Sequence, residues 1–324
     1  MSTLFGRKIS WQFIIIITLV SGTFSSCNPG INKEERNEDN QKVSSPIILA
    51  LNAYSFADLL LARDRRDNDQ VYSLFNLLEW CKTNNIKAID PTGYFFPTYP
   101  EVPSDEYLAD FKNRADELGI AISGTGIRNH FASPDPAIRA EGVELAKKWI
   151  VVASKIGAPV IRVFAGAIPS GYEDNWEDPA GWMIDCYKEL IPYAAQYKVK
   201  IGIQNHGEML QTAAQCLYVL ERVDSEWAGI IVDTGNFLTE DPYKDIAAMV
   251  PYAVNWQVKE YTKGVSGATR IDYEKFVRIL KEEGYTGYLP VETLNVKDEF
   301  YDPFQRVVGM MDSLKQAIAV VYTD

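Results

Sequence analysis

The chain has 324 residues, of which 47% are hydrophobic, 12% aromatic and 23% charged. This is the composition of a globular protein, and it excludes disordered and collagen-like chains. The chain has 32 Lys and Arg residues against 44 Asp and Glu residues, a net charge of -12. We expect no nucleic-acid partner, because phosphate binding depends on Lys and Arg. Two histidines exclude a site that needs three, and four cysteines without a CxxC pair make a zinc ribbon or a disulfide framework unexpected.

The first residues have the pattern of a secretory signal. Arg7 and Lys8 precede an apolar run over residues 11–20, which is shorter than the ~20 residues that span a bilayer but suits the core of a signal peptide. Small residues then lead to Cys27, which resembles a bacterial lipobox. The sequence predicts a lipoprotein signal peptide over residues 1–26 and a lipidated Cys27. The alternative is an ordinary secretory signal in which this cysteine has no role.

A polar and charged segment follows the cysteine. Residues 27–46 contain few side chains that could be buried, which is typical of a flexible tether. We therefore expect the folded part to begin near Pro46 and to lie in the cell envelope. The protein would be lipid-anchored and would face the periplasm or the outer surface of a bacterial membrane. Membrane contact would run through Cys27 only, and the oligomeric state is left open.

The rest of the chain alternates between short apolar runs and amphipathic segments. Eight runs are predicted strands: Ile48–Asn52, Ala88–Pro91, Ile120–Thr125, Val160–Ala165, Lys200–Asn205, Gly229–Asp233, Val254–Lys259 and Tyr288–Glu292. Helical spacing of apolar residues lies between them, for example over residues 143–153, ending at Gly157 as a C-cap. Such alternation predicts a parallel sheet. Eight units predict a single-domain α/β (β/α)8 TIM barrel over residues 47–324. A doubly wound sheet is the rival, but no GxGxxG follows the first strand.

Polar residues stand where the predicted strands end. Active sites of such barrels lie at the carboxyl ends of the strands, so these residues are candidates for substrate binding: Asp90, Arg128, Asn129, His130, Arg162, Asn205 and Asn236. Both histidines of the chain, His130 and His206, lie just past the ends of predicted strands. Two surface histidines could also fall there by chance.

Four oxygen-bearing side chains occupy interior depths where Val, Ile and Leu are usual. They are Gln204, Asp233, Gln257 and Glu292, on four consecutive strands. Burying them costs several kcal/mol unless something satisfies them. One solution is a hard divalent cation such as Mg²⁺, Mn²⁺ or Ca²⁺. The other is a metal-free hydrogen-bond network in which Lys259 and Arg162 supply positive charge.

Several segments resemble the xylose isomerase-like barrel family, also called sugar phosphate isomerases/epimerases. They are Ile201-Gly202-Ile203-Gln204-Asn205-His206-Gly207, Val232-Asp233-Thr234-Gly235-Asn236, Trp256-Gln257-Val258-Lys259-Glu260 and residues 284–292. The resemblance implies a barrel that holds one divalent cation, Mn²⁺ or Mg²⁺, through Glu, Asp, His and Glu on its last four strands. By resemblance the metal ligands here are Gln204, Asp233, Gln257 and Glu292.

Two of these four positions depart from the family pattern, because Gln204 replaces a Glu and Gln257 replaces a His. In the family's epimerases two Glu residues act as acid and base while the metal holds the enediolate. Gln204 cannot accept a proton, so Glu292 is predicted as one catalytic proton carrier. We expect His206 as the second, because its residue type titrates near ~6.5. The other candidates are His130, Glu208, Lys259 and Asp90.

The expected function is that of a sugar isomerase/epimerase-like enzyme assisted by a divalent metal. It would transfer a proton next to the carbonyl of a small non-phosphorylated sugar or keto-sugar. Planar polar groups and aromatic side chains at the strand ends are typical of a carbohydrate pocket. Phosphorylated sugars are mostly cytoplasmic, which disfavours them as substrates in the envelope. The alternatives are a non-catalytic carbohydrate-binding lipoprotein with a degenerate metal site, and a lyase or hydrolase of keto-glycosides.

Overall fold

A computed structural model describes residues 45–61, 72–207, 209–294 and 300–323. The predicted signal peptide, Cys27 and nearly all of the predicted tether lie outside the described residues, as does Glu208. Within the described ranges, no helix combines the length and the apolar character needed to cross a membrane.

The strands that build the sheet follow the chain order expected for a barrel. They are β1 (Ile47–Asn52), β2 (Ala88–Asp90), β3 (Ala121–Ile122), β4 (Thr125–Gly126), β5 (Val160–Val163), β6 (Lys200–Gln204), β7 (Ala228–Asp233), β8 (Ala253–Gln257) and β11 (Gly287–Val291). One sheet has the order β11-β1-β2-β3 and the other β4-β5-β6-β7-β8, with parallel pairing throughout.

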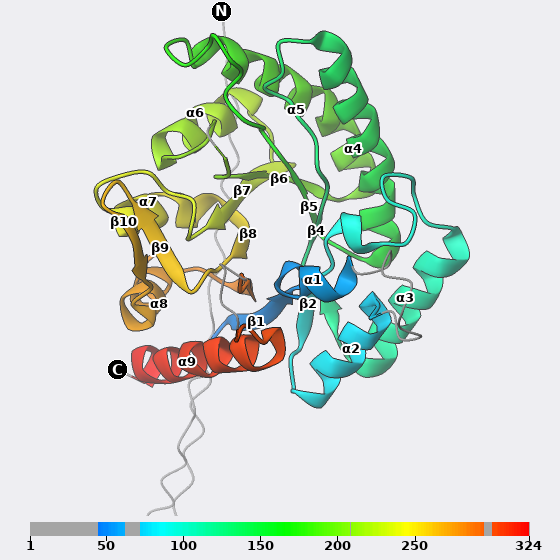
Figure 1. Cartoon of the computed structure of the whole chain (residues 1–324), viewed down its shortest axis with the longest axis vertical. Coiled ribbons are helices and arrows are strands. Elements are labelled where there is room, and N and C mark those ends of the chain that lie inside the picture. Colours follow the sequence, from blue (N-terminus) through cyan, green and yellow to red (C-terminus); the bar gives the residue numbers. More distant parts are fainter. Residues whose placement is uncertain (1–44, 62–71, 208, 295–299, 324) are drawn as a thin grey trace, which may run out of the picture. The chain divides into compact units, whose positions relative to one another are not determined.

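Two short links turn these sheets into a closed ring. The β3 and β4 strands follow one another and together form the third barrel strand. On the opposite side, Val258 and Val291 form a parallel bridge, so β8 and β11 are neighbours. The backbone N–H of Glu292 donates to the carbonyl of Val258 at 2.8 Å across this seam. The predicted (β/α)8 TIM barrel is confirmed, and Figure 1 shows its ring of helices around the strands.

The helices surround the strands, and most begin at a capping side chain. They are α1 (Ala57–Leu60), α2 (Leu74–Thr83), α3 (Asp105–Leu118), α4 (Pro136–Ile156), α5 (Glu177–Tyr197), α6 (Ala213–Val223), α7 (Pro242–Met249), α8 (Tyr273–Glu282) and α9 (Pro303–Thr323). Short 3-10 turns occur at Ala53–Phe56, Gly93–Phe95 and Val250–Tyr252. Asp135 caps α4, and Gly157 ends it in the left-handed conformation, as the sequence indicated.

The third barrel strand is interrupted, where the sequence predicted one continuous strand over 120–125. The interior beside Gly124 is filled by Asp90 and Asn255, whose side chains are hydrogen-bonded at 2.8 Å. A Cβ at Gly124 would lie 2.4 Å from Asn255 Nδ2, so only glycine fits there. Polar side chains therefore begin deep in the barrel, below the pocket.

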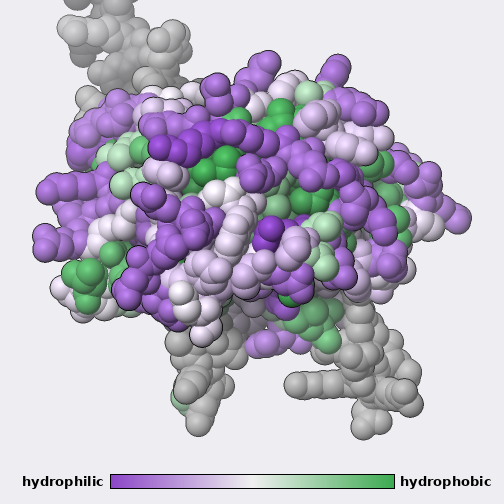
Figure 2. Space-filling model, turned by 90° about the horizontal axis from the view of Figure 1, so that it is seen from above, coloured by the Kyte–Doolittle hydropathy of each residue, from purple (hydrophilic) through white to green (hydrophobic). Residues whose placement is uncertain are grey.

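An antiparallel hairpin after β8 was not predicted. It consists of β9 (Tyr261–Gly264) and β10 (Gly267–Arg270), which pair in full register. Gly267 has a φ of +103°, which suits the turn between the two strands. The hairpin brings Tyr261 to the pocket. The face of the molecule shown in Figure 2 is mainly hydrophilic, with hydrophobic residues in separate groups.

Candidate functional site

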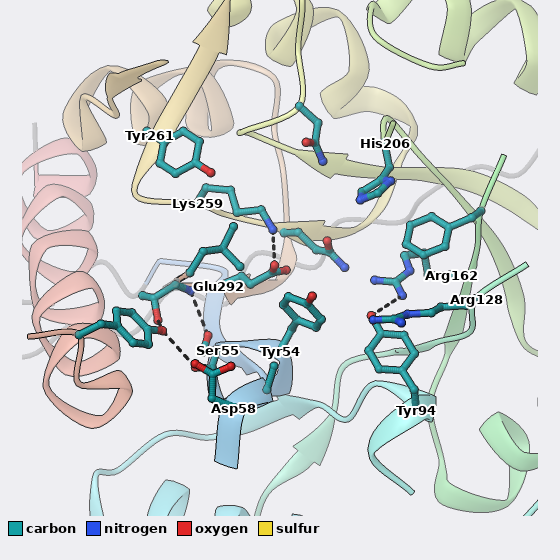
Figure 3. A pocket seen from close by; sticks show the side chains of 17 residues that line it. Tyr54, Ser55, Asp58, Tyr94, Arg128, Arg162, His206, Lys259, Tyr261 and Glu292 are labelled. Carbon is teal, nitrogen blue, oxygen red and sulfur yellow. Dashed lines mark hydrogen bonds and ion pairs between the residues drawn. The ribbon is translucent and has the colours of Figure 1, made fainter. Parts of the chain in front are cut away.

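A cavity with a volume of about 680 Å³ lies at the carboxyl ends of the barrel strands (Figure 3). This is the end at which TIM-barrel enzymes bind their substrates. Residues from all around the ring line it: Tyr54, Ser55, Ala57, Asp58, Tyr94, Arg128, Arg162, Phe164, His206, Asn236, Gln257, Lys259, Tyr261, Glu292, Thr293, Leu294 and Tyr301.

The four interior residues singled out in the sequence converge at the base of this pocket. Gln204 Nε2 donates to Asp233 Oδ2 at 2.8 Å and lies 2.6 Å from the Gln257 amide oxygen. Lys259 reaches into the same cluster, where its ammonium forms an ion pair with Glu292 and lies 3.4 Å from Asp233 Oδ2. All five side chains are at least 95% buried. We call these five residues the central cluster.

The amide of Gln257 can be placed in two orientations that differ by a rotation of 180°. With its oxygen toward Gln204, that oxygen also faces two carboxylates, and its nitrogen faces Arg162. The rotated amide accepts from Arg162 Nη1 at 2.9 Å and donates to Asp233 and Glu292, each at 3.2 Å. The rotation gives up the hydrogen bond to Gln204, so that the two amide nitrogens lie 2.6 Å apart, and it gains three hydrogen bonds. We prefer it because no carboxylate then faces an oxygen.

The donor set does not fit a divalent cation. Every carboxylate oxygen of the cluster already has a donor: Asp233 Oδ1 accepts from the Gly235 N–H at 2.9 Å, Asp233 Oδ2 from Gln204, Glu292 Oε1 from Lys259 and Glu292 Oε2 from the rotated Gln257 amide. A divalent ion would have to share these oxygens with an ammonium group, at a high cost in like-charge repulsion. Among the described residues, no group of three or more His, Cys, Asp and Glu side chains could hold a metal ion.

In the structure, Gln204, Asp233, Gln257 and Glu292 form hydrogen bonds with one another, an arrangement that does not favour the predicted metal-ligand roles. The alternative network, charged by Lys259 and Arg162, is the arrangement that the structure contains. Burial alone would lower the pKa of Lys259, but Asp233 and Glu292 outweigh it and raise that pKa, so the side chain stays charged.

The opposite wall of the pocket carries two guanidinium groups around Tyr94. Arg162 Nη2 donates to the Tyr94 hydroxyl at 3.0 Å, and its guanidinium lies 4.1 Å from the centre of the Phe164 ring. The Arg128 guanidinium lies 4.4 Å from the centre of the Tyr94 ring, in a cation–π contact. Neither arginine has a carboxylate within 4.0 Å among the described residues. We call Tyr94, Arg128, Arg162 and Phe164 the arginine wall.

His206 lies between the arginine wall and the central cluster. Its ring contacts Phe164 at 4.5 Å between centres. Burial, followed by the positive charges of Arg162 and Lys259, lowers the pKa of His206 to about 4. More than a third of the side chain is still open to water in the pocket, which weakens these effects without changing their direction. At neutral pH the imidazole is uncharged.

Two predicted substrate ligands have structural roles instead. Asn205 is fully buried, and its amide forms a pair of hydrogen bonds with the backbone of Asp233, at 2.7 and 2.8 Å. Asn129 does the same with the backbone of Phe164, at 2.6 and 2.7 Å. Each asparagine thus fixes a neighbouring strand end with one donor and one acceptor of its amide. Neither residue lines the cavity.

Two further candidates lie away from the cavity. Asp90 is buried below it and accepts from Asn255, and burial raises its pKa to about 6 despite the nearby Arg162 charge. His130 packs beside Gly166 and is exposed. By contrast, Arg128, Arg162, His206, Asn236, Lys259 and Glu292 do line the cavity, as the sequence predicted.

Several lining residues had no clear signal in the sequence. Tyr261 belongs to the unpredicted hairpin. Ser55, Thr293 and Tyr301 form a hydrogen-bonded group beyond the ends of β1 and β11: the Thr293 N–H donates to Ser55 Oγ at 3.0 Å, and the Tyr301 and Thr293 hydroxyls are 2.7 Å apart. The only hint of this group was that Ser55 and Thr293 come within three residues of the ends of predicted strands.

Comparison with known proteins places the chain in a family. The family described as xylose isomerase-like TIM barrel matches residues 78–317. The L-ribulose-5-phosphate 3-epimerase UlaE of Shigella flexneri serotype 5b (strain 8401) is 24% identical over 223 residues, covering 64% of this chain and 76% of the relative. The protein belongs to the xylose isomerase-like TIM barrel family.

Solved structures show the same fold at low identity. A D-psicose 3-epimerase from Clostridium cellulolyticum H10, solved with D-tagatose, superposes with a TM-score of 0.65 at 17% identity, covering 84% of this chain and 99% of that one. The 3-keto-D-glucoside 4-epimerase YcjR from E. coli gives 0.65 at 12% identity, with coverage of 83% and 99%. These likenesses support the barrel fold.

Proposed function

We propose that this protein is an isomerase-class enzyme that transfers a proton next to the carbonyl of a non-phosphorylated sugar or keto-sugar. The observation that carries the proposal is the Glu292–Lys259 ion pair, which lines the large pocket at the catalytic end of the barrel. A carboxylate there can remove a proton from carbon, and family relatives named as sugar epimerases support this reaction class.

The residues of the pocket suit the separate tasks of such a reaction. Glu292 is the proton carrier, because it is the carboxylate of the central cluster that lines the cavity. Tyr54 and Tyr94 offer aromatic faces to the apolar side of a sugar ring, while Arg128 and Asn236 offer donors to its hydroxyls. We propose the uncharged imidazole of His206 as the second carrier: it can take a proton from a hydroxyl and return it.

The reaction is tested by following hydrogen exchange in deuterated water. The protein is incubated with free sugars and with keto-sugars, and deuterium uptake next to the carbonyl is measured by mass spectrometry and NMR. Uptake that depends on Glu292 supports the proposal. Absence of uptake with every sugar tested, in a protein that binds one of them, would instead support the non-catalytic carbohydrate-binding alternative. That alternative is favoured by Gln204, which stands where a second carboxylate would be needed.

Product analysis separates the remaining reaction types. Removal of the same proton from a keto-glycoside can be followed by loss of the glycosidic group, so released aglycone would indicate a lyase or hydrolase. Recovery of an epimer or an isomer would indicate proton return to the sugar. The same pocket serves both outcomes, because both start from a carboxylate and a carbonyl.

We also propose that the protein is anchored in the cell envelope through a lipid on Cys27. The support is the sequence pattern that precedes this cysteine. Metabolic labelling with a radioactive fatty acid tests the proposal. Label should appear in the wild-type protein and be absent from Cys27→Ser, whereas Cys81→Ser, which changes a buried cysteine of the barrel, should keep it.

A further inference from the structure

The side chain of Lys259 enters the barrel interior beside Gly235, which has no side chain to obstruct it. A Cβ at Gly235 would lie 2.7 Å from Cγ of Lys259, so the turn after β7 must be glycine for the lysine stem to pass. The backbone N–H of Lys259 donates to Thr234 Oγ1 at 2.8 Å, which fixes the strand end from which the side chain starts. The position of the Lys259 side chain in the cluster is therefore fixed by Gly235 and Thr234.

The ammonium group of Lys259 lies between two buried carboxylates. Asp233 and Glu292 are two carboxylates buried at the base of one pocket, and Lys259 contacts both. An ammonium carries three N–H donors. Two are directed to the carboxylates, and since Lys259 also lines the cavity, the third is available to a ligand oxygen.

We propose that Lys259 performs in this protein the task of a divalent cation, so that the pocket works without a metal. The fixed ammonium forms ion pairs with Asp233 and Glu292 and donates to the carbonyl oxygen of the bound sugar. Glu292 takes up the neighbouring proton, the electron pair of the broken C–H bond forms a C=C bond, and the π pair of the carbonyl moves onto its oxygen, which Lys259 stabilises. Return of the proton to carbon restores the carbonyl, so the step needs no oxidant or reductant. The assignment of the carbonyl rests on the proposed function, whereas metal independence does not.

Metal content and thermal stability test the first part without any assay of activity. The purified protein should contain less than a stoichiometric amount of any divalent metal after dialysis against MnCl₂, and its Tm should be the same in MnCl₂ and in EDTA. One retained equivalent of metal, or a lower Tm in EDTA, would overturn the proposal. Isothermal titration calorimetry of the wild-type protein with MnCl₂ measures metal binding directly and should detect none.

A designed variant tests whether Lys259 occupies the place of a cation. Gln204→Glu, Gln257→His and Lys259→Met together replace the ammonium and supply three carboxylates and an imidazole, a set that suits Mn²⁺. We expect this variant to bind about one equivalent of Mn²⁺ and to gain about 5 °C in Tm at saturating metal. A folded variant that binds no Mn²⁺ would contradict the proposal.

The catalytic part is tested with the single variant. Lys259→Met should reduce deuterium uptake by about 100-fold, the size expected for loss of one oxyanion-stabilising group, while uptake by the wild type stays the same in EDTA. Lys263→Met, which changes an exposed lysine of β9, is the matched control and should behave as wild type. Unchanged uptake in folded Lys259→Met would overturn the catalytic role. Absence of uptake in the wild type would count against the proposed function and leave the metal measurements standing.

Discussion

The central cluster and the arginine wall line one pocket and meet at the hydrogen bond between Arg162 and Gln257, but they satisfy their charges in opposite ways. In the central cluster each charged group contacts a group of opposite charge, and the amides of Gln204 and Gln257 donate to the carboxylates. On the arginine wall, the guanidinium groups lie against aromatic rings and, in the described part of the chain, have no carboxylate within 4.0 Å. The cluster is thus fixed in advance, whereas the wall keeps donors available for a ligand. Substitutions in the cluster should therefore affect chemistry and folding, and substitutions in the wall should affect binding.

The largest effect is expected on the reaction itself. Glu292→Gln keeps the shape of the side chain but cannot accept a proton, so deuterium uptake should fall by about 100- to 10,000-fold. Sugar affinity, measured by calorimetry, should change much less. Glu260→Gln is the control, because this glutamate pairs with Arg306 and does not line the pocket. Equal loss of uptake in both variants would contradict the role given to Glu292.

Next in size is the effect of Lys259→Met on folding. Removing the ammonium leaves Asp233 and Glu292 buried without their counter-charge, so the free energy of unfolding should fall by about 3–5 kcal/mol. Urea unfolding followed by circular dichroism measures it, with Lys263→Met as the exposed control. A variant as stable as wild type would mean that the ion pair does not neutralise the cluster.

Asn205 and Asn129 form the same pair of side-chain hydrogen bonds to a neighbouring backbone but differ in burial, so their contributions to stability can be compared. Asn205→Ala removes two hydrogen bonds from a fully buried strand end and should cost about 2–4 kcal/mol. Asn129→Ala removes the same pattern of bonds at a partly exposed position, where water can replace them, and should cost about 1–2 kcal/mol. If urea unfolding showed the larger loss of stability for Asn129→Ala, burial would not explain the difference between the two asparagines.

On the arginine wall the expected effect is on affinity alone. Arg128→Ala should weaken sugar binding about 10-fold, because a charged donor to the ligand is lost, and should leave the Tm unchanged. Arg270→Ala, at an exposed position of β10, is the control. Calorimetry and thermal unfolding give both quantities. A large drop in Tm for Arg128→Ala would remove the contrast between wall and cluster.

The smallest expected effect is a pH dependence that comes from His206. Its pKa is lowered to about 4 in the folded protein, from about 6.5 in the unfolded chain. Between these values the unfolded state binds more protons, so stability contributed by the neutral imidazole is lost as pH falls through this window. Asp90, whose pKa is raised to about 6, acts in the opposite direction. The informative quantity is therefore the difference in Tm between wild type and His206→Gln. The stability of the wild type relative to this variant should decrease as the pH falls from about 6.5 to about 4.

The barrel fold and many of the residues around the pocket could be predicted from the sequence alone. Alternation of eight apolar runs with amphipathic segments leaves few other folds, because parallel strands must be connected by crossing helices. The convergence of Gln204, Asp233, Gln257 and Glu292 was also predictable, since residues at equal depth on neighbouring strands of a closed barrel face one axis.

The hydrogen-bond or ion-pair partner of each polar side chain, by contrast, depends on the tertiary structure. Asn255, Gln257 and Lys259 alternate along one strand and point into the barrel, yet the sequence does not say that the first binds Asp90 and the last binds Glu292. The same ambiguity made Asn129 and Asn205 resemble sugar ligands, although both hold backbone groups of the next strand. An amide or an ammonium can satisfy many partners. Distances between residues far apart in the chain select one of them, and at the base of this pocket they select Lys259 as the partner of both Asp233 and Glu292.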